Sequence, residues 1–236
     1  MSHFKIIRLF ALLLLPFHAD AQSKKWVPLQ TIKQLENSVE KDREMDMVNL
    51  QKTVPDLIID LRYASKNNFT GVRMYPANTN YTFLRKSPAL AMVVAAKELK
   101  TMNLGFKIWD AYRPYHVTEK FWELIHDERY VANPAKGSGH NRGIAVDLTL
   151  YDLSTGKEIN MPTGFDDFSE AAHHGQILAD NEKTNNRELL RTIMEKHGFI
   201  KFETEWWHYY WPGSDRFDVL DIPFEKLKKR KHAAKE

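Results

Sequence analysis

Short apolar runs alternate with longer polar stretches along this chain, and together they predict both strands and helices. Runs rich in β-branched and aromatic residues predict strands, because such side chains pack well on a pleated surface. Apolar residues that recur every three or four positions predict helices. The strands are expected at residues 57–61, 106–110, 144–150 and 206–211, and the helices at 88–99, 114–126 and 187–197.

Start and stop signals refine two of these helices. The first begins after Ser87 with Pro88 at its first position, where the missing N–H costs nothing. Its buried face is expected to contain Ala89, Leu90, Met92, Val93, Ala96 and Leu99. In the last helix, Asn185 or Asn186 is the expected N-cap and Gly198 follows the end.

The strands and helices mix without a repeating βαβ rhythm, which favours an α+β fold. We expect a single domain with a central antiparallel or mixed sheet and helices packed on it. The domain is predicted to cover residues 57–224. Residues 22–56 are expected to form a charged lead-in, helical or extended, and residues 225–236 a basic C-terminal tail.

The first 21 residues have the three parts of a signal peptide. Lys5 and Arg8 precede an apolar run at 9–17, and Ala19-Asp20-Ala21 has the form of a cleavage site. The apolar run is shorter than the roughly 20 residues that a membrane span needs. The alternative is a buried N-terminal helix. We expect an exported protein of the periplasm or exterior, with no membrane span in the mature chain.

Composition narrows the class of protein further. The chain has 236 residues, 43% of them hydrophobic, a formal net charge of +3 and no cysteine. The mature length suits one domain that buries roughly 70% of its unfolded surface without disulfides. The absence of cysteine excludes a thiol nucleophile, and the balanced charge does not indicate a nucleic-acid partner. The basic tail is typical of a solvated end, with an anionic surface as the alternative partner.

Two segments contain the residue types of a hydrolytic zinc site. His140 and Asp147 stand in Ser-Gly-His-Asn-Arg-Gly-Ile-Ala-Val-Asp (138–147), and Glu205 and His208 in Glu-Trp-Trp-His (205–208). Such a site uses three protein ligands and leaves one position for water. Two histidines and one carboxylate supply the ligands for one Zn²⁺ per chain, and a spare carboxylate can exchange protons with the water.

Strand geometry makes it plausible that these residues converge. On a strand through residues 144–150, Asp147 faces away from Val146 and Leu148. Gly139 and Gly143 flank His140, and their freedom at positive φ would let the chain turn it towards Asp147. Glu205 stands at the start of the last strand and needs a bend or bulge to join His208.

Six segments, taken in order, resemble the D-alanyl-D-alanine dipeptidase family of zinc D,D-peptidases, which share their fold with the hedgehog signalling domain. The likeness extends from about Leu57 to Trp211. The segments are residues 68–71, 110–114, 138–149, 165–168, 186–190 and 205–209.

The resemblance implies a role for individual residues. His140, Asp147 and His208 would bind zinc, and Glu205 would be the general base. Arg113 would stabilise the oxyanion, with Asp110 orienting it; the alternative is a purely structural Arg113–Asp110 pair. At the substrate, Asp166 would receive the ammonium group with help from Tyr63, and Ser138 would contact the substrate near the metal.

The function implied is hydrolysis of the small dipeptide D-Ala-D-Ala, in peptidoglycan turnover or dipeptide scavenging. Export fits poorly with the role in glycopeptide resistance that the best-known family members have inside the cell. Two alternatives remain open. One is an exported zinc D,D-carboxypeptidase or endopeptidase acting on peptidoglycan stem peptides. The other is a non-catalytic cell-wall-binding module, although such a module needs neither Glu205 nor Arg113.

Overall fold

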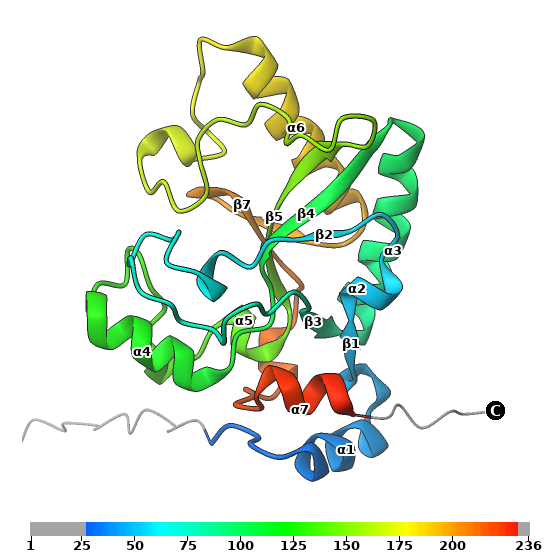
Figure 1. Ribbon diagram of the computed structural model, residues 1–236, viewed down its shortest axis with the longest axis vertical. Coiled ribbons are helices and arrows are strands. Elements are labelled where there is room, and N and C mark those ends of the chain that lie inside the picture. Colours follow the sequence, from blue (N-terminus) through cyan, green and yellow to red (C-terminus); the bar gives the residue numbers. More distant parts are fainter. Residues whose placement is uncertain (1–26, 231–236) are drawn as a thin grey trace, which may run out of the picture.

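The structure is a computed structural model that describes residues 27–230 (Figure 1). The predicted signal peptide and the last six residues of the basic tail lie outside that range. The helices are α1 (Ile32–Lys41), α2 (Leu50–Thr53), α3 (Lys86–Thr101), α4 (Tyr115–Ile125), α5 (Gly139–Arg142), α6 (Asn181–Lys196) and α7 (Phe224–Lys229). The strands are β1 (Met47–Asn49), β2 (Ile58–Ile59), β3 (Phe83–Arg85), β4 (Leu104–Asp110), β5 (Ala145–Asp152), β6 (Ile200–Phe202) and β7 (Glu205–Tyr210).

A mixed five-stranded sheet forms the centre of the fold, in the order β2-β4-β5-β7-β6. β2 is parallel to β4, and the other neighbours are antiparallel. β1 and β3 form a separate antiparallel pair. The predicted single α+β domain with an antiparallel or mixed sheet is therefore confirmed.

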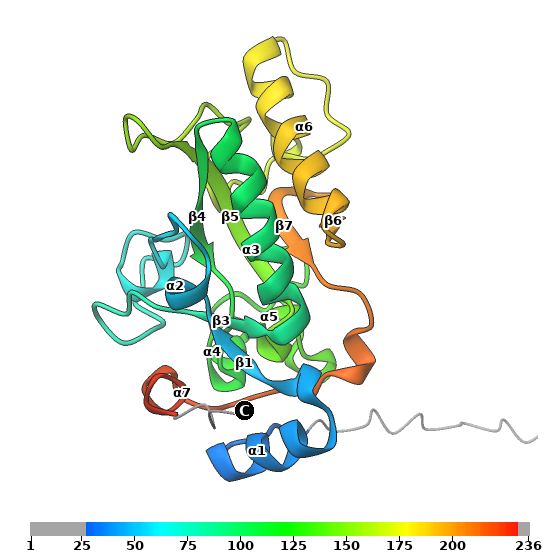
Figure 2. The same ribbon diagram turned by 90° about the vertical axis from the view of Figure 1, so that its right-hand side faces the viewer.

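The helices α3 and α6 cover one face of the sheet, while α4 and irregular segments lie on the other (Figures 1 and 2). Figures 1 and 2 show α3 and α6 together on one side, with α4 and the segment after β2 on the other. Along α3, small alanines let the helix pack closely on the sheet. Its buried residues are Pro88, Ala89, Met92, Ala95, Ala96 and Leu99.

The predicted elements form, with three corrections. α3 begins at Lys86, two residues before the expected start, and Leu90 is 53% exposed although we expected it on the buried face. α6 begins six residues before the predicted helix. Its N-cap is Asp180, whose carboxylate accepts from the backbone N–H groups of Glu182 and Lys183, so Asn185 and Asn186 lie inside the helix.

Both ends of the described chain pack against the central domain. Leu35, Met47 and Leu50 of the lead-in belong to the main hydrophobic core, as do Phe224 and Leu227 of α7. The segments that precede α1 and α7 lie side by side through a bridge between Leu29 and Leu220. Within residues 27–230, none of the helices has the length and apolar character needed to cross a membrane.

Candidate active site

Three neighbouring strands bring the predicted polar residues to one row across the sheet. Asp147 of β5 is the register partner of His208 on β7 and, on its other side, of Asp110 at the end of β4. The register between β4 and β5 shifts between Ile108 and Asp110, so that Asp110 comes opposite Asp147. All three residues face away from the apolar layer of Val146 and Leu148, as the alternation on the strand predicted.

His140 approaches this row from the short helix α5. Gly143 ends the helix in the left-handed region at φ 69° and turns the chain into β5, as the sequence predicted. Gly139 acts differently from our expectation, since it is not among the residues with positive φ. A Cβ atom at Gly139 would lie 2.8 Å from the Cβ of Ala145, so glycine is required there for close packing.

A register shift in the last hairpin joins Glu205 to His208. Lys201 pairs with Tyr209, but Phe202 pairs with Glu205, so extra residues of β7 are accommodated between these two pairs. The predicted bend or bulge is thereby confirmed. It places Oε2 of Glu205 3.9 Å from Nδ1 of His208.

His140, Asp147 and His208 form a cluster that could hold a metal ion. One ligand atom from each lies within 4.8 Å of the others. Nε2 of His140 is 3.4 Å from Oδ2 of Asp147, and Nδ1 of His208 is 2.8 Å from Oδ1 of Asp147. Ligands about 2.0–2.2 Å from a tetrahedral zinc ion lie about 3.3–3.6 Å apart, so small adjustments suffice.

The surroundings of the cluster favour the ligand forms of His140 and Asp147. Nδ1 of His140 lies 2.7 Å from the carbonyl oxygen of Ala111, which leaves Nε2 free to bind an ion. Burial alone would raise the pKa of Asp147, but His140 and His208 lower it below the ordinary range. Asp147 is therefore a carboxylate at neutral pH, and the three residues fit a divalent ion.

Arg113 is held by a fully buried carboxylate. Oδ2 of Asp110 accepts from Nε of Arg113 at 3.0 Å and from Nη2 at 2.7 Å. Oδ1 accepts from the hydroxyl of Tyr75 at 2.6 Å and from the backbone N–H of Ala111 at 2.9 Å. Burial would lower the pKa of Arg113, but Asp110 raises it, so the guanidinium stays charged.

A second carboxylate, Asp166, lies half-buried beside a tyrosine. The hydroxyl of Tyr63 donates to Oδ1 and Oδ2 of Asp166 at 3.0 and 3.2 Å. Asp166 has a positive φ of 61°, which marks the tight loop that holds it. Burial raises the pKa of Asp166 well above its ordinary range, and the nearby Asp147 adds to this. An approaching cation would restore its negative charge.

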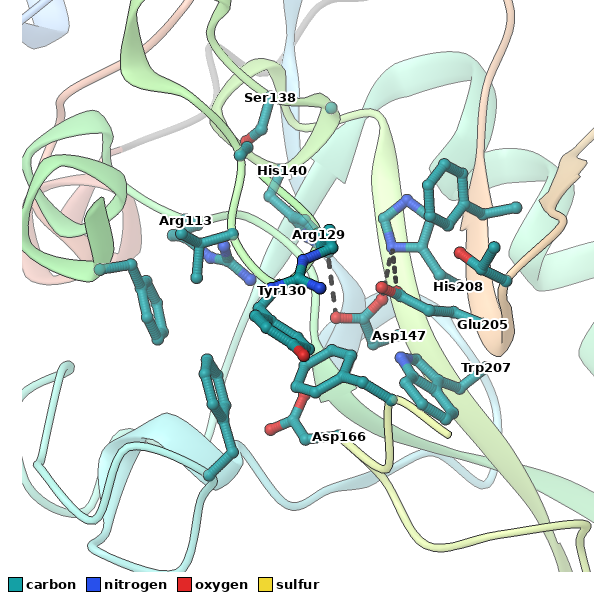
Figure 3. A pocket seen from close by; sticks show the side chains of 18 of the residues that line it. Arg113, Arg129, Tyr130, Ser138, His140, Asp147, Asp166, Glu205, Trp207 and His208 are labelled. Carbon is teal, nitrogen blue, oxygen red and sulfur yellow. Dashed lines mark hydrogen bonds and ion pairs between the residues drawn. The ribbon is translucent and has the colours of Figure 1, made fainter. Parts of the chain in front are cut away.

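All but one of the predicted site residues line one cavity of about 650 Å³. Asp110 is the exception, because it lies behind Arg113 and is fully buried. Figure 3 shows Ser138 and Asp166 at opposite ends, with the cluster of His140, Asp147 and His208 between them. Ser138 is the N-cap of α5, and its hydroxyl oxygen accepts from the backbone N–H of Asn141. Its own O–H can still donate.

Sequence reasoning missed several residues at this site. Tyr75 supports Asp110 from an irregular segment, where no periodicity could have indicated it. Arg129 and Tyr130 line the cavity from the segment after α4 (Figure 3). Trp207 lines it as well, although the aromatic run in which it stands suggested only core packing.

The fold and the site define a class, a metal-dependent hydrolase, with two histidines and one aspartate that could hold the metal ion. The comparisons with known proteins then define the family. Residues 43–229 match the family model described as D-ala-D-ala dipeptidase. The chain belongs to this family and is a metallopeptidase.

Several characterised relatives share most of the chain. A D-alanyl-D-alanine dipeptidase of Escherichia coli K12 is 34% identical over 179 residues, which is 76% of this chain and 91% of the relative. One from Enterococcus faecalis is 34% identical over 64% of this chain and 83% of the relative. One from Enterococcus faecium is 32% identical over 70% of this chain and 91% of the relative.

A solved structure of an LD-carboxypeptidase, reported as revealing the basis of peptidoglycan recognition, is also similar. Its identity is 20% and its TM-score 0.42, with 78% of this chain and 77% of the other covered. At that level the likeness carries no argument about activity.

Proposed function

We propose that the protein hydrolyses the free dipeptide D-Ala-D-Ala, with Zn²⁺ bound by His140, Asp147 and His208. Family membership supports the reaction, and the cluster supports the metal. A bound zinc ion supplies a Lewis acid that polarises the carbonyl and lowers the pKa of a coordinated water. Two nitrogen ligands and one oxygen ligand, together with hydrolysis, favour zinc over harder ions.

Glu205 is the proposed general base. It lines the cavity beside His208, and it is not one of the three ligands. Burial raises the pKa of Glu205; the neighbouring His208 opposes this, and Asp147 adds to it. A raised pKa lets the carboxylate take a proton from water and later give it to the leaving amine.

Arg113 is the proposed donor to the oxygen that gains charge during water attack. Its backbone N–H donates to the carbonyl oxygen of His140, so the arginine stands directly beside a proposed ligand. Its guanidinium is 4.8 Å from the ring centre of Phe121, and Asp110 holds its Nε and Nη2. A donor fixed in this way needs no reorganisation as charge develops.

Asp166 and Tyr63 are proposed to recognise the ammonium group of the dipeptide. The observation that carries the proposed function is that this half-buried carboxylate shares one cavity with the metal cluster and Glu205. A free amino group would be required for binding, because a cation is the group that pairs with the carboxylate once water is displaced. A carboxypeptidase or endopeptidase, which accepts a blocked amino group, has no use for such a residue.

Blocked and free substrates test the proposal. The zinc-loaded protein should cleave free D-Ala-D-Ala at least about 100-fold faster than N-acetyl-D-Ala-D-Ala, since the acetyl group removes the charge. An N-acylated tripeptide ending in D-Ala-D-Ala should also resist cleavage. Cleavage of the blocked peptides but not of the free dipeptide would replace the proposal with a stem-peptide carboxypeptidase.

We also propose that the protein is exported and acts on dipeptide from peptidoglycan turnover or from outside the cell. The support is the signal-peptide pattern of residues 1–21. The basic side chains of the predicted tail, residues 225–236, of which 225–229 lie in α7, are proposed to be solvated or to touch an anionic surface. Cell fractionation and N-terminal sequencing test export; an intact N-terminus in the cytoplasmic fraction would contradict it.

A further inference from the structure

We propose that Arg129 binds the C-terminal carboxylate of the dipeptide and so makes the enzyme specific for a free C-terminus. This inference deepens the proposed function and rests on it. The predicted set of site residues provides for the amino group and the scissile carbonyl, but it contains no cation for the carboxylate. Such a cation is needed because a carboxylate that leaves water for a cavity loses its hydration, and a paired cation offsets that loss.

Two arginines line the cavity, and no lysine does so among the lining residues within the described range. Arg113 is buried, with its Nε and Nη2 on Asp110 and its guanidinium beside the rings of Tyr63 and Phe121. It is already assigned to the scissile carbonyl. Arg129 is 76% exposed in its side chain, so its guanidinium is open to a ligand that enters from solvent.

The guanidinium of Arg129 is oriented by its neighbour Asp127. Nε of Arg129 lies 3.0 Å from each carboxylate oxygen of Asp127, and Nη2 lies 2.6 Å from Oδ2. These bonds use one edge of the planar group. The other edge, formed by Nη1 and the second hydrogen of Nη2, stays available to bind a carboxylate in a bidentate manner.

The segment that carries Arg129 is itself fixed against the cavity. The backbone N–H of Arg129 donates to Oδ1 of Asp127. The backbone N–H groups of Tyr130 and Val131 donate to the carbonyl oxygen of Asp127. The ring of Tyr130 meets that of Phe168 edge to face at 5.1 Å. Val131 is buried. The arginine therefore stands on a held turn instead of a free loop.

The direction of the bound dipeptide agrees with this assignment. Its ammonium group would lie at Asp166 and its scissile bond at the cluster, so its carboxylate extends towards Ser138. In Figure 3 Arg129 lies in front of the cluster, on the Ser138 side of Tyr130. The hydroxyl of Ser138 can donate to the same carboxylate as Arg129.

Paired substrates separate this role from a general effect on the enzyme. The rates to compare are kcat/KM for D-Ala-D-Ala and for its C-terminal amide, which lacks the negative charge. Arg129→Gln should lower kcat/KM on the free dipeptide by about 10- to 100-fold, the usual effect of losing a charge-assisted pair. It should leave the rate on the amide within about threefold. Arg129→Lys should restore part of the loss.

Lys136→Gln is the matched control. Lys136 is 69% exposed, pairs with Glu128 of the same segment and does not line the cavity. Its replacement should change neither rate. Equal losses on both substrates in Arg129→Gln, or no loss on either, would overturn the inference, as would an equal effect of Lys136→Gln. A wild-type protein that fails to cleave the free dipeptide would instead overturn the proposed function itself.

Discussion

The hydroxyl of Tyr75 should matter for both folding and catalysis, because it completes the support of Asp110. Replacement by phenylalanine removes one of four hydrogen bonds to a carboxylate that is fully buried. A hydrogen bond to a charged group contributes about 1.5–3 kcal/mol. Tyr75 is itself only 2% exposed, so bulk water cannot replace the lost donor. Tyr75→Phe should therefore lower the free energy of unfolding by about 1.5–3 kcal/mol.

The same change should slow the reaction by loosening Arg113. Loss of a whole oxyanion donor costs about 10²- to 10³-fold in rate. Since Nε and Nη2 of Arg113 keep their bonds to Asp110 in the variant, we expect about a tenfold loss in kcat with little change in KM, or about 1.4 kcal/mol in the barrier. Urea unfolding and steady-state kinetics on D-Ala-D-Ala measure the two effects.

Tyr112→Phe is the control for this experiment. The Tyr112 hydroxyl is also buried, but it donates to the carbonyl of Ile222 at 2.8 Å and accepts from the N–H of Ile222 at 2.9 Å. Its loss should lower stability by a similar amount and leave kcat within about threefold. If Tyr75→Phe is destabilised and yet keeps the wild-type kcat, Tyr75 does not position Arg113 and our reasoning on this network is wrong.

Three further predictions concern the metal, the base and pH. Glu205→Gln should keep its metal but lose about 10²- to 10⁴-fold in kcat, the range of general base catalysis; metal analysis that finds less ion than in the wild type would place Glu205 among the ligands instead. His208→Ala should lose most of its bound metal, and a full equivalent retained after dialysis would contradict the ligand set. Burial lowers the pKa of His174 to about 4, with Lys201 and Arg187 adding to the effect. The folded-state pKa lies below the unfolded value of 6.5. The contribution of neutral His174 to the free energy of unfolding is therefore fully present above pH 6.5 and is lost as the pH falls towards 4. That loss is on the order of 2 kcal/mol. Urea unfolding at several pH values between 4 and 7 should show that the free energy of unfolding falls less steeply with pH in His174→Phe than in the wild type. Parallel plots of unfolding free energy against pH would show that His174 does not titrate in this way.

The elements that could be predicted are those in which local pattern and tertiary environment agree. β5 alternates cleanly, so the orientation of Asp147 followed from the sequence. The residue types of the metal cluster could also be predicted, because two histidines and one aspartate match the ligands of a hydrolytic zinc site and Glu205 supplies a spare carboxylate. Gly143, at the end of α5, indicated the turn that brings His140 towards Asp147.

The errors arose where tertiary contacts override local preference. The first turns of α6 contain Asn181, Thr184 and Asn185, which are poor helix formers. They are helical because Asp180 caps the helix, and the side chains of Lys183 and Asn186 donate to carbonyl oxygens of the segment 160–162. No window of sequence contains those partners.

The remaining parts of the site depend on pairings between distant residues. Tyr75 and Asp110 are 35 positions apart, and Tyr63 and Asp166 are 103 apart. Both tyrosines stand in the segment after β2, whereas Asp110 ends β4 and Asp166 follows β5, so only folding brings each pair together. Resemblance suggested Tyr63 and Asp166 in advance, whereas Tyr75 and Arg129 became visible only in the folded chain.

Stepwise addition of zinc to the metal-free protein, with D-Ala-D-Ala hydrolysis followed at each step, tests the central claim most directly. We predict that activity rises in proportion to added zinc and stops rising at one equivalent per chain, since one cluster of two histidines and one aspartate holds one ion. A metal-free protein that hydrolyses the dipeptide at the full rate would contradict the account, and so would a zinc-loaded protein that leaves the free dipeptide intact.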